Sequence, residues 1–553
     1  MNEKVYGIDL GTTYSCIAGF DENGKVEVFE NDIMESTTPS VVWFHDGKKA
    51  TVGAIAKEQI AIEPTSVVSA IKREMGSNYS IKQLGKEFKP EMVSALILKK
   101  LVKDAKLSRF PKPKVVITVP AYFGINEREA TKNAGVLAGL DVLALIDEPS
   151  AAAISYGMEQ EKLDGKNVLV YDLGGGTFDV TIINISHEIK VIATEGDSRL
   201  GGRDWDEEIA NYFIERFCKE KGYDKESISK DKAFYAQIMS VAEKIKRQLS
   251  YRTSTKVAFK YDKFGDSISF DFSREDFNDL TEVLLYRTTL LVEKALEEAK
   301  KKDSTFSTSD IEILMVGGST LMPQVAEMLE KKFNKKPKSY NPHEAVARGA
   351  AFYALQVNKV KETTEKGGNI DELFLGGDVS KNNQSEDLSL GGEKFIRVKP
   401  VTSKSYGIRY FKSVSDKNGY VLNVILKNTQ IPFKPNEDSR EGISKCATLS
   451  ENASSVLFEL YENEDTTFRK ELDIEDDFCT KKGEMILALP PNMPKHEPLT
   501  VFMELSEDGL LHVWGIHNRT GNKCEVSIKT ENILSQEEIG RTAQEIVDGI
   551  MID

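Results

Sequence analysis

A duplicated aspartate turn constrains the fold of this chain more than any other feature of its sequence. Asp9 lies within an apolar run and opens the turn Asp-Leu-Gly-Thr-Thr, and Asp172 opens a second turn, Asp-Leu-Gly-Gly-Gly-Thr. In such turns, backbone N–H groups and hydroxyls can approach phosphate oxygens, while the carboxylate can hold Mg²⁺ through water. The repeat predicts two related halves that face each other across a phosphate site. The alternative is a pair of ordinary Asp-Gly hairpin turns.

Two common nucleotide-binding signatures are absent from the sequence. The residues after Gly176 read Thr-Phe-Asp-Val-Thr-Ile-Ile, which predicts a strand, whereas a helix follows the dinucleotide-binding GxGxxG turn. The sequence also lacks a Gly-x-x-x-x-Gly-Lys-Ser/Thr loop. We therefore expect any nucleotide to lie between hairpin turns from two lobes.

Two further glycine turns fit the same cleft. Gly201-Gly202 ends a polar segment, and Gly317-Gly318-Ser319 lies between an apolar run and a helix that Pro323 is expected to open. The N-terminal amides of that helix could face an anion.

Apolar residues at helical spacing predict a helix over residues 238–249. Its other face carries Glu243, Lys246, Arg247 and Ser250. An exposed Glu243–Arg247 ion pair, worth roughly a few tenths of a kcal/mol, is the alternative to a binding role.

Short apolar runs alternate with long amphipathic stretches over residues 1–356, which predicts an α/β fold with a largely parallel sheet. Residues 357–394 hold three Gly-Gly pairs among polar residues and predict a flexible linker. Shorter alternating segments over residues 395–530 predict an antiparallel β unit. Residues 531–553 predict one short amphipathic helix.

The composition is that of a globular protein of two or three domains, because 553 residues exceed what one core usually organises. The net charge of −15 would repel phosphate backbones, so we expect no nucleic-acid partner. The five cysteines form neither a disulfide framework nor a zinc motif. Without a recognisable signal segment or apolar span, we expect a cytoplasmic protein with no membrane contact.

Five motifs resemble the DnaK-type chaperones of the 70-kDa heat shock protein family. They are Asp9-Leu-Gly-Thr-Thr, Val119-Pro-Ala-Tyr-Phe, Glu148-Pro-Ser-Ala-Ala-Ala, Asp172-Leu-Gly-Gly-Gly-Thr-Phe-Asp-Val and Gly317-Gly-Ser-Thr. The resemblance is strong over residues 4–356 and weaker over 395–530, and Met75-Gly-Ser-Asn is similar to the compact bacterial HscC branch. It implies an actin-like, two-lobed ATPase, followed by a β-sandwich that binds peptide. Slow hydrolysis of Mg·ATP to ADP would be coupled to the binding of unfolded, apolar polypeptide.

The resemblance also implies roles for single residues. Asp9 and Asp172 would position Mg²⁺ through water, and Lys72 would stabilise charge on the transferring phosphoryl group. The attacking water would be ordered or deprotonated by Glu148, Asp172 and Asp179, with Thr177 as a further catalytic residue. Nucleotide would be held by Gly11, Thr12, Thr13, Tyr14, Gly174, Gly175, Gly176, Thr177, Gly201, Gly202, Glu243, Lys246, Arg247, Ser250, Gly317, Gly318 and Ser319. Peptide would be gripped by Ile408, Tyr410, Phe411, Cys446, Val456 and Phe458, for which a place in the sandwich core is the alternative.

Several positions depart from the family pattern. Leu321 stands where an arginine usually faces the adenine, which predicts nucleotide affinity weaker by about 1 kcal/mol. His343 stands where an aspartate is common, and Ala144 replaces a basic residue used toward J-domain partners. A J-domain co-chaperone and a nucleotide exchange factor are the partners that the resemblance implies. The short final segment predicts an incomplete lid and fast exchange of clients.

Other functions remain compatible with these residues. The family's short Asp-flanked leucine run is absent from the linker, where Phe395-Ile396-Arg397-Val398 is its nearest relative. This departure, Ala144 and the incomplete lid also suit a nucleotide-dependent regulatory protein that serves one dedicated partner. An actin-like filament or a small-molecule kinase is a third reading of the same fold, against which the C-terminal β unit argues.

Overall fold

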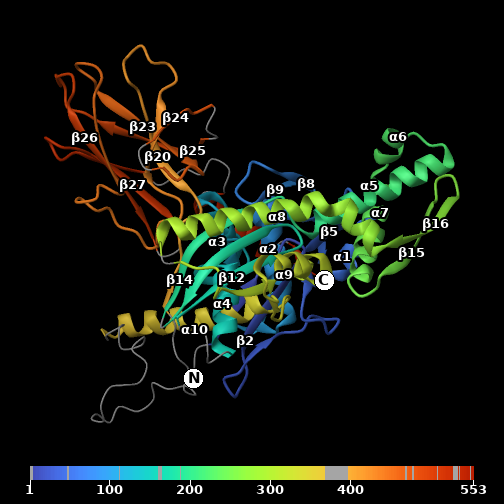
Figure 1. Cartoon of the computed structure of the whole chain (residues 1–553). Coiled ribbons are helices and arrows are strands. Elements are labelled where there is room, and N and C mark those ends of the chain that lie inside the picture. The colour runs from blue at the N-terminus through green and yellow to red at the C-terminus, as the bar shows by residue number, and fades with distance from the viewer. Residues whose placement is uncertain are drawn as a thin grey trace, which may run out of the picture. The chain divides into compact units, whose positions relative to one another are not determined.

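A computed structural model describes residues 4–45, 49–110, 112–159, 165–186, 188–304, 306–367, 397–467, 470–475, 479–506, 509–526, 534, 536–547 and 550–552. The chain forms two compact units (Figure 1). Unit 1 comprises Met1–Ala121, Thr131–Val398 and Leu534–Asp553. Unit 2 comprises Tyr122–Ala130 and Lys399–Ile533.

Two sheets of unit 1 share one strand pattern. The first has the order β11 (Asp141–Asp147), β10 (Lys114–Val119), β1 (Val5–Asp9), β2 (Tyr14–Phe20), β3 (Val26–Val28), with β4 (Thr38–Pro39) beside β2. The second has the order β18 (Lys338–Ser339), β17 (Glu312–Val316), β12 (Lys166–Leu173), β13 (Phe178–Ile185), β14 (Glu188–Asp197), β19 (Arg397–Lys399). In each sheet the strand that carries the aspartate pairs antiparallel with the next strand and parallel with a later one. The predicted duplication and the strand after Gly176 are confirmed.

The expectation of a largely parallel sheet is wrong. Strands β1, β2 and β3 are antiparallel to one another, and so are β12, β13 and β14, whereas β1 is parallel to β10 and β12 is parallel to β17. The physical reason is the shortness of the phosphate turns, because a few residues can only reverse the chain, whereas a parallel neighbour needs a crossover segment. Each sheet is therefore mixed.

The chain also contains helices that pack on its sheets or on one another. In chain order they are α1 (Ala54–Glu58), α2 (Pro90–Asp104), α3 (Ile125–Leu137), α4 (Glu148–Glu159), α5 (Gly202–Lys221), α6 (Lys225–Ser229), α7 (Lys232–Leu249), α8 (Arg274–Lys302), α9 (Pro323–Phe333) and α10 (Ala345–Glu365). Helix α10 packs on β1, β2 and α4, and α8 packs on β13 and β14. Three short 3-10 turns are η1 (Ile71–Glu74), η2 (Leu107–Arg109) and η3 (Gly318–Leu321). None of the helices in the described ranges combines the length and apolar character that a bilayer span requires.

Helix α7 shows how the sequence builds the second half of unit 1. Ile238, Ala242, Ile245 and Leu249 recur at helical spacing and are all buried in one core cluster. That cluster also holds the buried Trp205 of α5 and Phe259 of β15 (Ser254–Tyr261), which pairs with β16 (Asp266–Ser273). Burying one large apolar side chain contributes roughly 1.5 to 3 kcal/mol to folding stability. Burial of this stripe therefore fixes the orientation of α7 and leaves its other face to polar side chains.

Helix α10 continues through Glu365, so the first residues expected in the linker are helical instead. One face of this helix packs against the rest of unit 1, and Ala351 and Ala354 are buried on that face. Residues 368–394, the rest of the expected linker, lie outside the described residues.

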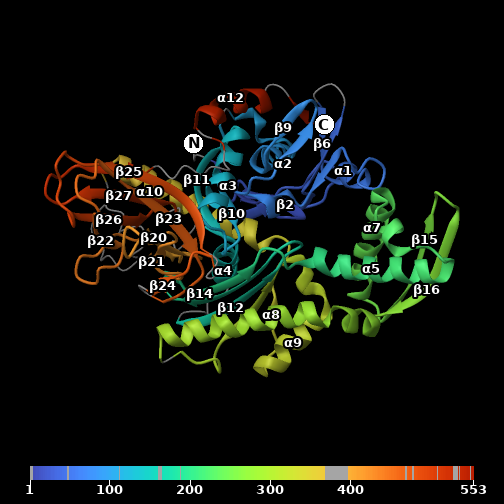
Figure 2. The same cartoon turned by 90° about the horizontal axis from the view of Figure 1, so that it is seen from above.

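A small sheet of unit 1 has the order β29 (Met551–Ile552), β6 (Lys49–Val52), β5 (Val41–His45), β7 (Val67–Ser69). A separate hairpin consists of β8 (Ile81–Gln83) and β9 (Lys86–Phe88). Helix α12 (Gln536–Val547), the short helix expected near the C-terminus, belongs to unit 1 and lies beside α2 and α3 (Figure 2). Ser535 of its expected capping box lies outside the described residues.

Unit 2 is a β-sandwich, as expected from the family resemblance. One sheet has the order β24 (Glu471–Leu472), β21 (Tyr420–Ile425), β20 (Ser405–Tyr410), β23 (Ser455–Asn463), β25 (Thr480–Ala488). The other has the order β22 (Ile443–Ala447), β26 (Pro498–Leu505), β27 (Leu511–His517), β28 (Lys523–Val526). Alternate residues of both sheets, such as Leu460, Val501 and Val513, form the core between them.

Candidate functional site

The two aspartate turns of unit 1 meet directly. A Cβ atom on Gly176 would lie 2.2 Å from Thr12 Cγ2, and one on Gly175 would lie 1.8 Å from Thr13 Oγ1. Real Cβ atoms do not approach other atoms so closely, so only glycine fits at these two positions. The structure thus brings together the two Gly/Thr turns, which follow Asp9 and Asp172 and lie far apart in the sequence.

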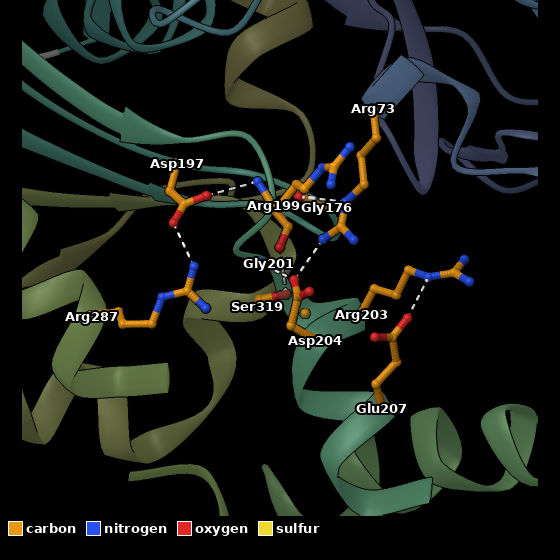
Figure 3. Close-up of polar contacts among 12 residues, drawn as sticks. Arg73, Gly176, Asp197, Arg199, Gly201, Arg203, Asp204, Glu207, Arg287 and Ser319 are labelled. Atoms are coloured by element: carbon orange, nitrogen blue, oxygen red, sulfur yellow. Dashed lines mark hydrogen bonds and ion pairs between the residues drawn. The ribbon is translucent and has the colours of Figure 1, made fainter. Parts of the chain in front are cut away.

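The second turn is held through its carbonyl groups (Figure 3). Gly174 O accepts from Ser319 Oγ (2.8 Å) and Gly202 N (3.0 Å), Gly175 O from Arg203 N (2.8 Å), and Gly176 O from Arg73 Nε (2.8 Å). Arg73 also contacts Asp204 at 2.6 Å, and Asp204 accepts from Gly201 N at 2.7 Å. Because the carbonyl edge is occupied by protein donors, the amide edge is the one we expect to face an anion.

A buried lysine, three buried carboxylates and the partly buried Asp9 lie where these turns begin. Lys72 of η1 forms a short ion pair with Glu148, the first residue of α4. Asp9 ends β1 and accepts from Thr118 Oγ1 at 3.1 Å. Asp172 and Asp179 face each other in the β12–β13 register. The structure therefore brings five of the predicted catalytic and metal-positioning residues together from separate segments, namely Asp9, Lys72, Glu148, Asp172 and Asp179.

Burial and mutual repulsion make these carboxylates weak acids. Burial, with the charge of Glu148, raises the pKa of Asp9 to about 7, and Lys72 opposes the shift. Burial and the same glutamate raise the pKa of Asp172 and of Asp179 well above the ordinary value. Each ionised carboxylate removed from water raises the cost of the next, so the cluster favours a cation.

The carboxylate cluster fits a hydrated divalent cation. Asp179 Oδ1 is buried and lacks a hydrogen-bond partner among the described residues, which is a costly arrangement unless water or an ion completes it. In the described ranges, no three His, Cys, Asp or Glu side chains are placed to ligate one metal ion directly. A Mg²⁺ ion at this site would therefore complete its shell with water and phosphate oxygens, as Mg²⁺ usually does.

The polar face of α7 has partners that the sequence did not reveal. Glu243 pairs with Lys57 of α1 at 2.7 Å, and Lys57 also donates to the hydroxyl of Tyr14 at 3.0 Å. Burial opposes ionisation of Glu243, but Lys57 lowers the pKa of this carboxyl below its ordinary value. The expected alternative, a simple Glu243–Arg247 pair, is replaced by a bridge from α7 to α1.

Lys246 is buried deeper in the same region. It pairs with Asp206 of α5 at 2.8 Å and donates to Gly202 O at 2.6 Å. Burial raises the pKa of Asp206 to about 6, and Lys246 opposes the shift. The Ser250 hydroxyl donates to Lys246 O at 3.3 Å.

A cavity of about 500 Å³ lies along α7 and the turn after it. It is lined by Lys57, Ser240, Glu243, Lys244, Arg247, Gln248, Tyr251 and Arg252. Two of the four predicted α7 residues, Glu243 and Arg247, line this cavity, which suits the nucleoside part of a nucleotide.

The third glycine turn is packed against His343. Gly317 N donates to Pro342 O at 3.0 Å, and a Cβ atom on Gly318 would lie 2.5 Å from His343 Cε1. Burial, and then the charge of Arg247, lowers the pKa of His343, so this environment disfavours the charged ring. Leu321 is 36% exposed at the end of η3, which suits a side chain that packs on a ligand. Pro323 begins α9, as the sequence predicts.

Sequence reasoning missed four polar residues of the site. Lys57, Thr118 and Asp206 are single polar residues in ordinary segments, and only the fold brings them to Glu243, Asp9 and Lys246. Arg73 could have been suspected because it follows Lys72 directly.

The six peptide-site candidates of the sandwich differ in exposure. Ile408 and Phe458 are buried in the core between the sheets, which is the alternative that the sequence left open for them. Tyr410, Cys446 and Val456 are partly buried against the same core, and Phe411 is 38% exposed beneath the guanidinium of Arg409.

Comparison with known proteins gives a consistent assignment. The Hsp70 protein family profile matches residues 5–365. The chaperone protein DnaK of Thermosipho melanesiensis is 34% identical over 551 residues, which is 98% of this chain and 83% of that protein. The chaperone protein DnaK of Thermotoga neapolitana is 34% identical over 553 residues, with the same coverage of both chains. The chain therefore belongs to the Hsp70 family of ATP-dependent chaperones, which bind and hydrolyse ATP and bind unfolded polypeptides.

Proposed function

We propose that the cluster around Lys72 hydrolyses Mg·ATP and that its nucleotide state controls polypeptide binding by the sandwich. The observation that carries the first part is the buried Lys72–Glu148 pair beside Asp9, Asp172 and Asp179. A bound Mg²⁺ ion would neutralise phosphate charge at Asp9 and Asp172. The two Gly/Thr turns and the cavity along α7 then supply the phosphate and nucleoside parts of one site.

We assign a separate catalytic role to each of three residues of the cluster, Lys72, Asp179 and Glu148. The Lys72 ammonium would stabilise charge on the transferring phosphoryl group. Asp179, with its unpartnered Oδ1, is the group we assign to orient the attacking water, and Glu148 would accept its proton. Because these groups are buried, little solvent reorganises during the reaction, and the charges act in a low dielectric.

The test of this assignment is Lys72→Ala. We expect single-turnover hydrolysis to fall about 10²- to 10³-fold, as it does when one electrostatic donor to a transition state is removed. ADP binding, followed by calorimetry, should persist. Lys57→Ala is the matched control, since it removes a lysine of the same cleft that lies away from the carboxylate cluster. Turnover by Lys72→Ala that equals the wild-type rate would refute the assignment.

Removal of Lys72 leaves Glu148 buried without its cation, which can cost about 3 to 5 kcal/mol of stability. A Lys72→Ala, Glu148→Gln double variant removes the unpaired charge and separates misfolding from lost chemistry. If both variants fold, as judged by thermal melting, and both lose turnover, the catalytic role of the pair is supported.

The second part of the proposal assigns peptide binding to exposed members of the candidate set. Phe411 and the partly buried Tyr410, Cys446 and Val456 are available to an extended peptide, and main-chain hydrogen bonds would supply affinity without strong sequence selection. Ile408 and Phe458 support this surface from the core.

A library of apolar peptides, titrated with ADP and with ATP, tests this assignment. Affinity for many peptides that falls with ATP, and that Phe411→Ala weakens, supports it. Binding to one partner alone, whatever the nucleotide, would favour the dedicated-partner alternative.

A J-domain co-chaperone and a nucleotide exchange factor remain proposed partners. Ala144, which replaces a basic residue of relatives, is buried within β11 and presents no side chain to a partner. We therefore expect any J-domain contact to depend on other residues. The cytoplasmic location and the HscC branch stay predictions.

A further inference from the structure

Near the C-terminus, residue 534, residues 536–547 and residues 550–552 belong to unit 1 and approach α2 (Figure 2). We call these residues the C-terminal strap. Leu534 N donates to Glu91 Oε1 at 3.0 Å in the first turn of α2, and at the other end of α2, Lys103 Nζ donates to Ile552 O at 2.6 Å. The strap therefore contacts both ends of the same helix.

The contacts are partly buried and specific. Leu534, Ile539 and Ile550 are all buried. Glu91 is 1% exposed, so the backbone of the strap supplies a hydrogen bond to a carboxylate that water does not reach. Asn133 Nδ2 approaches Leu534 O at 3.5 Å. A buried acceptor that loses such a donor is costly, which favours one docked position.

The last contact of the strap is a strand addition. Met551 pairs with Lys49 and Ile552 with Ala50 in parallel register, so β29 occupies the edge of β6. The other side of β6 is already paired with β5. Strand addition to an open edge is a common mode of peptide recognition, here used within one chain.

Two lysines of the proposed nucleotide site lie directly after strands of the small sheet that receives the strap. Lys57 lies on α1, directly after β6, and Lys72 lies on η1, directly after β7. Helix α2 also supports η1, because Ser94 Oγ donates to Met75 Sδ at 3.5 Å in a buried contact. A segment that fixes β6 and α2 therefore fixes the supports of Lys57 and Lys72.

We propose that the C-terminal strap is an intramolecular clamp on this part of the ATPase unit, which slows nucleotide release by holding the supports of Lys57 and Lys72 in place. Residues 399–533 of the sandwich unit lie between two segments of unit 1 in the sequence. By linkage, any factor by which the strap tightens ADP binding is the factor by which ADP tightens strap docking.

The test uses the full chain and a matched pair of variants. Ile552→Pro removes a backbone N–H from the added strand, whereas Ile552→Val keeps the N–H and the β-branched side chain. Hydrogen exchange at the amides of Lys49–Val52 reports the pairing, and displacement of a labelled ADP reports nucleotide release. Exchange within β12 and β13 serves as the folding control.

We expect Ile552→Pro to speed amide exchange in β6 and ADP release, each by about tenfold, while Ile552→Val behaves as wild type. Equal β6 exchange in the two variants would overturn the strand pairing. Faster β6 exchange with unchanged ADP release would overturn the clamp. The exchange readout needs no nucleotide, so failure of the proposed catalytic roles would not mimic either result.

Discussion

The bridge between Lys57 and Glu243 gives the sharpest test of how the cleft holds nucleotide. Lys57 Nζ lies 2.8 Å from Glu243 Oε1 and 2.7 Å from Oε2, and the two side chains are 28% and 22% exposed. Lys57 lies on α1, which follows β6 of the small sheet, and Glu243 lies on α7, along the cavity. If nucleotide leaves by separation of α1 from α7, this bridge must break first.

The magnitude follows from the geometry. A hydrogen bond between charged groups contributes roughly 1.5 to 3 kcal/mol, and partial exposure places this pair near the lower value. The pKa shifts of Lys57 and Glu243 both indicate that each charge stabilises the other. Burial opposes both charges, yet Glu243 raises the pKa of Lys57, and Lys57 lowers the pKa of Glu243. A coupling of about 1.4 kcal/mol corresponds to a tenfold change in rate.

The assay is a double-mutant cycle on ADP dissociation, measured by stopped-flow displacement of labelled ADP. Lys57→Ala and Glu243→Ala should each speed release by about tenfold, and the double variant should add little to either single variant. Single-turnover hydrolysis should change less than in Lys72→Ala. If the two single effects simply multiply in the double variant, the pair is not coupled and the reasoning fails.

Three further predictions concern other parts of the site. Gly176→Ala would place its Cβ 2.2 Å from Thr12 Cγ2, so we expect ATP affinity to drop at least about tenfold while the thermal transition of the sandwich stays unchanged. The folded pKa of Asp9 is raised from 3.8 to about 7, so its ionisation costs folding free energy, and nucleotide-free protein should lose stability as pH rises from about 4 through 7. A cation displaces that proton, so the rise in melting temperature caused by Mg·ADP should grow over pH 6 to 8, and Asp9→Asn should flatten the trend. Leu321→Arg should tighten ADP binding by about 1 kcal/mol if a guanidinium stacks on the base, and Leu321→Met, which lacks the charge, should leave calorimetric affinity unchanged.

Much of the fold was readable because its signals are local. The turns after Asp9 and Asp172 require glycine and threonine at fixed spacing, the stripe from Ile238 to Leu249 has a helical period, and Pro323 opens a helix. Each of these features is decided by residues within one or two turns of the chain. The strand directions could not be predicted in this way, because apolar runs alternate with amphipathic stretches in the same pattern for parallel and mixed sheets.

The sequence by itself determined that two related aspartate turns would face each other and that a β unit would follow an α/β unit. Only the tertiary structure decided the partners of the charged residues, since Lys57 reaches Glu243 and Lys246 reaches Asp206 from other helices. It also decided that residues 551–552 add a strand to β6. The physical reason is that burial and pairing of a charge depend on segments far away in sequence, which local spacing does not encode.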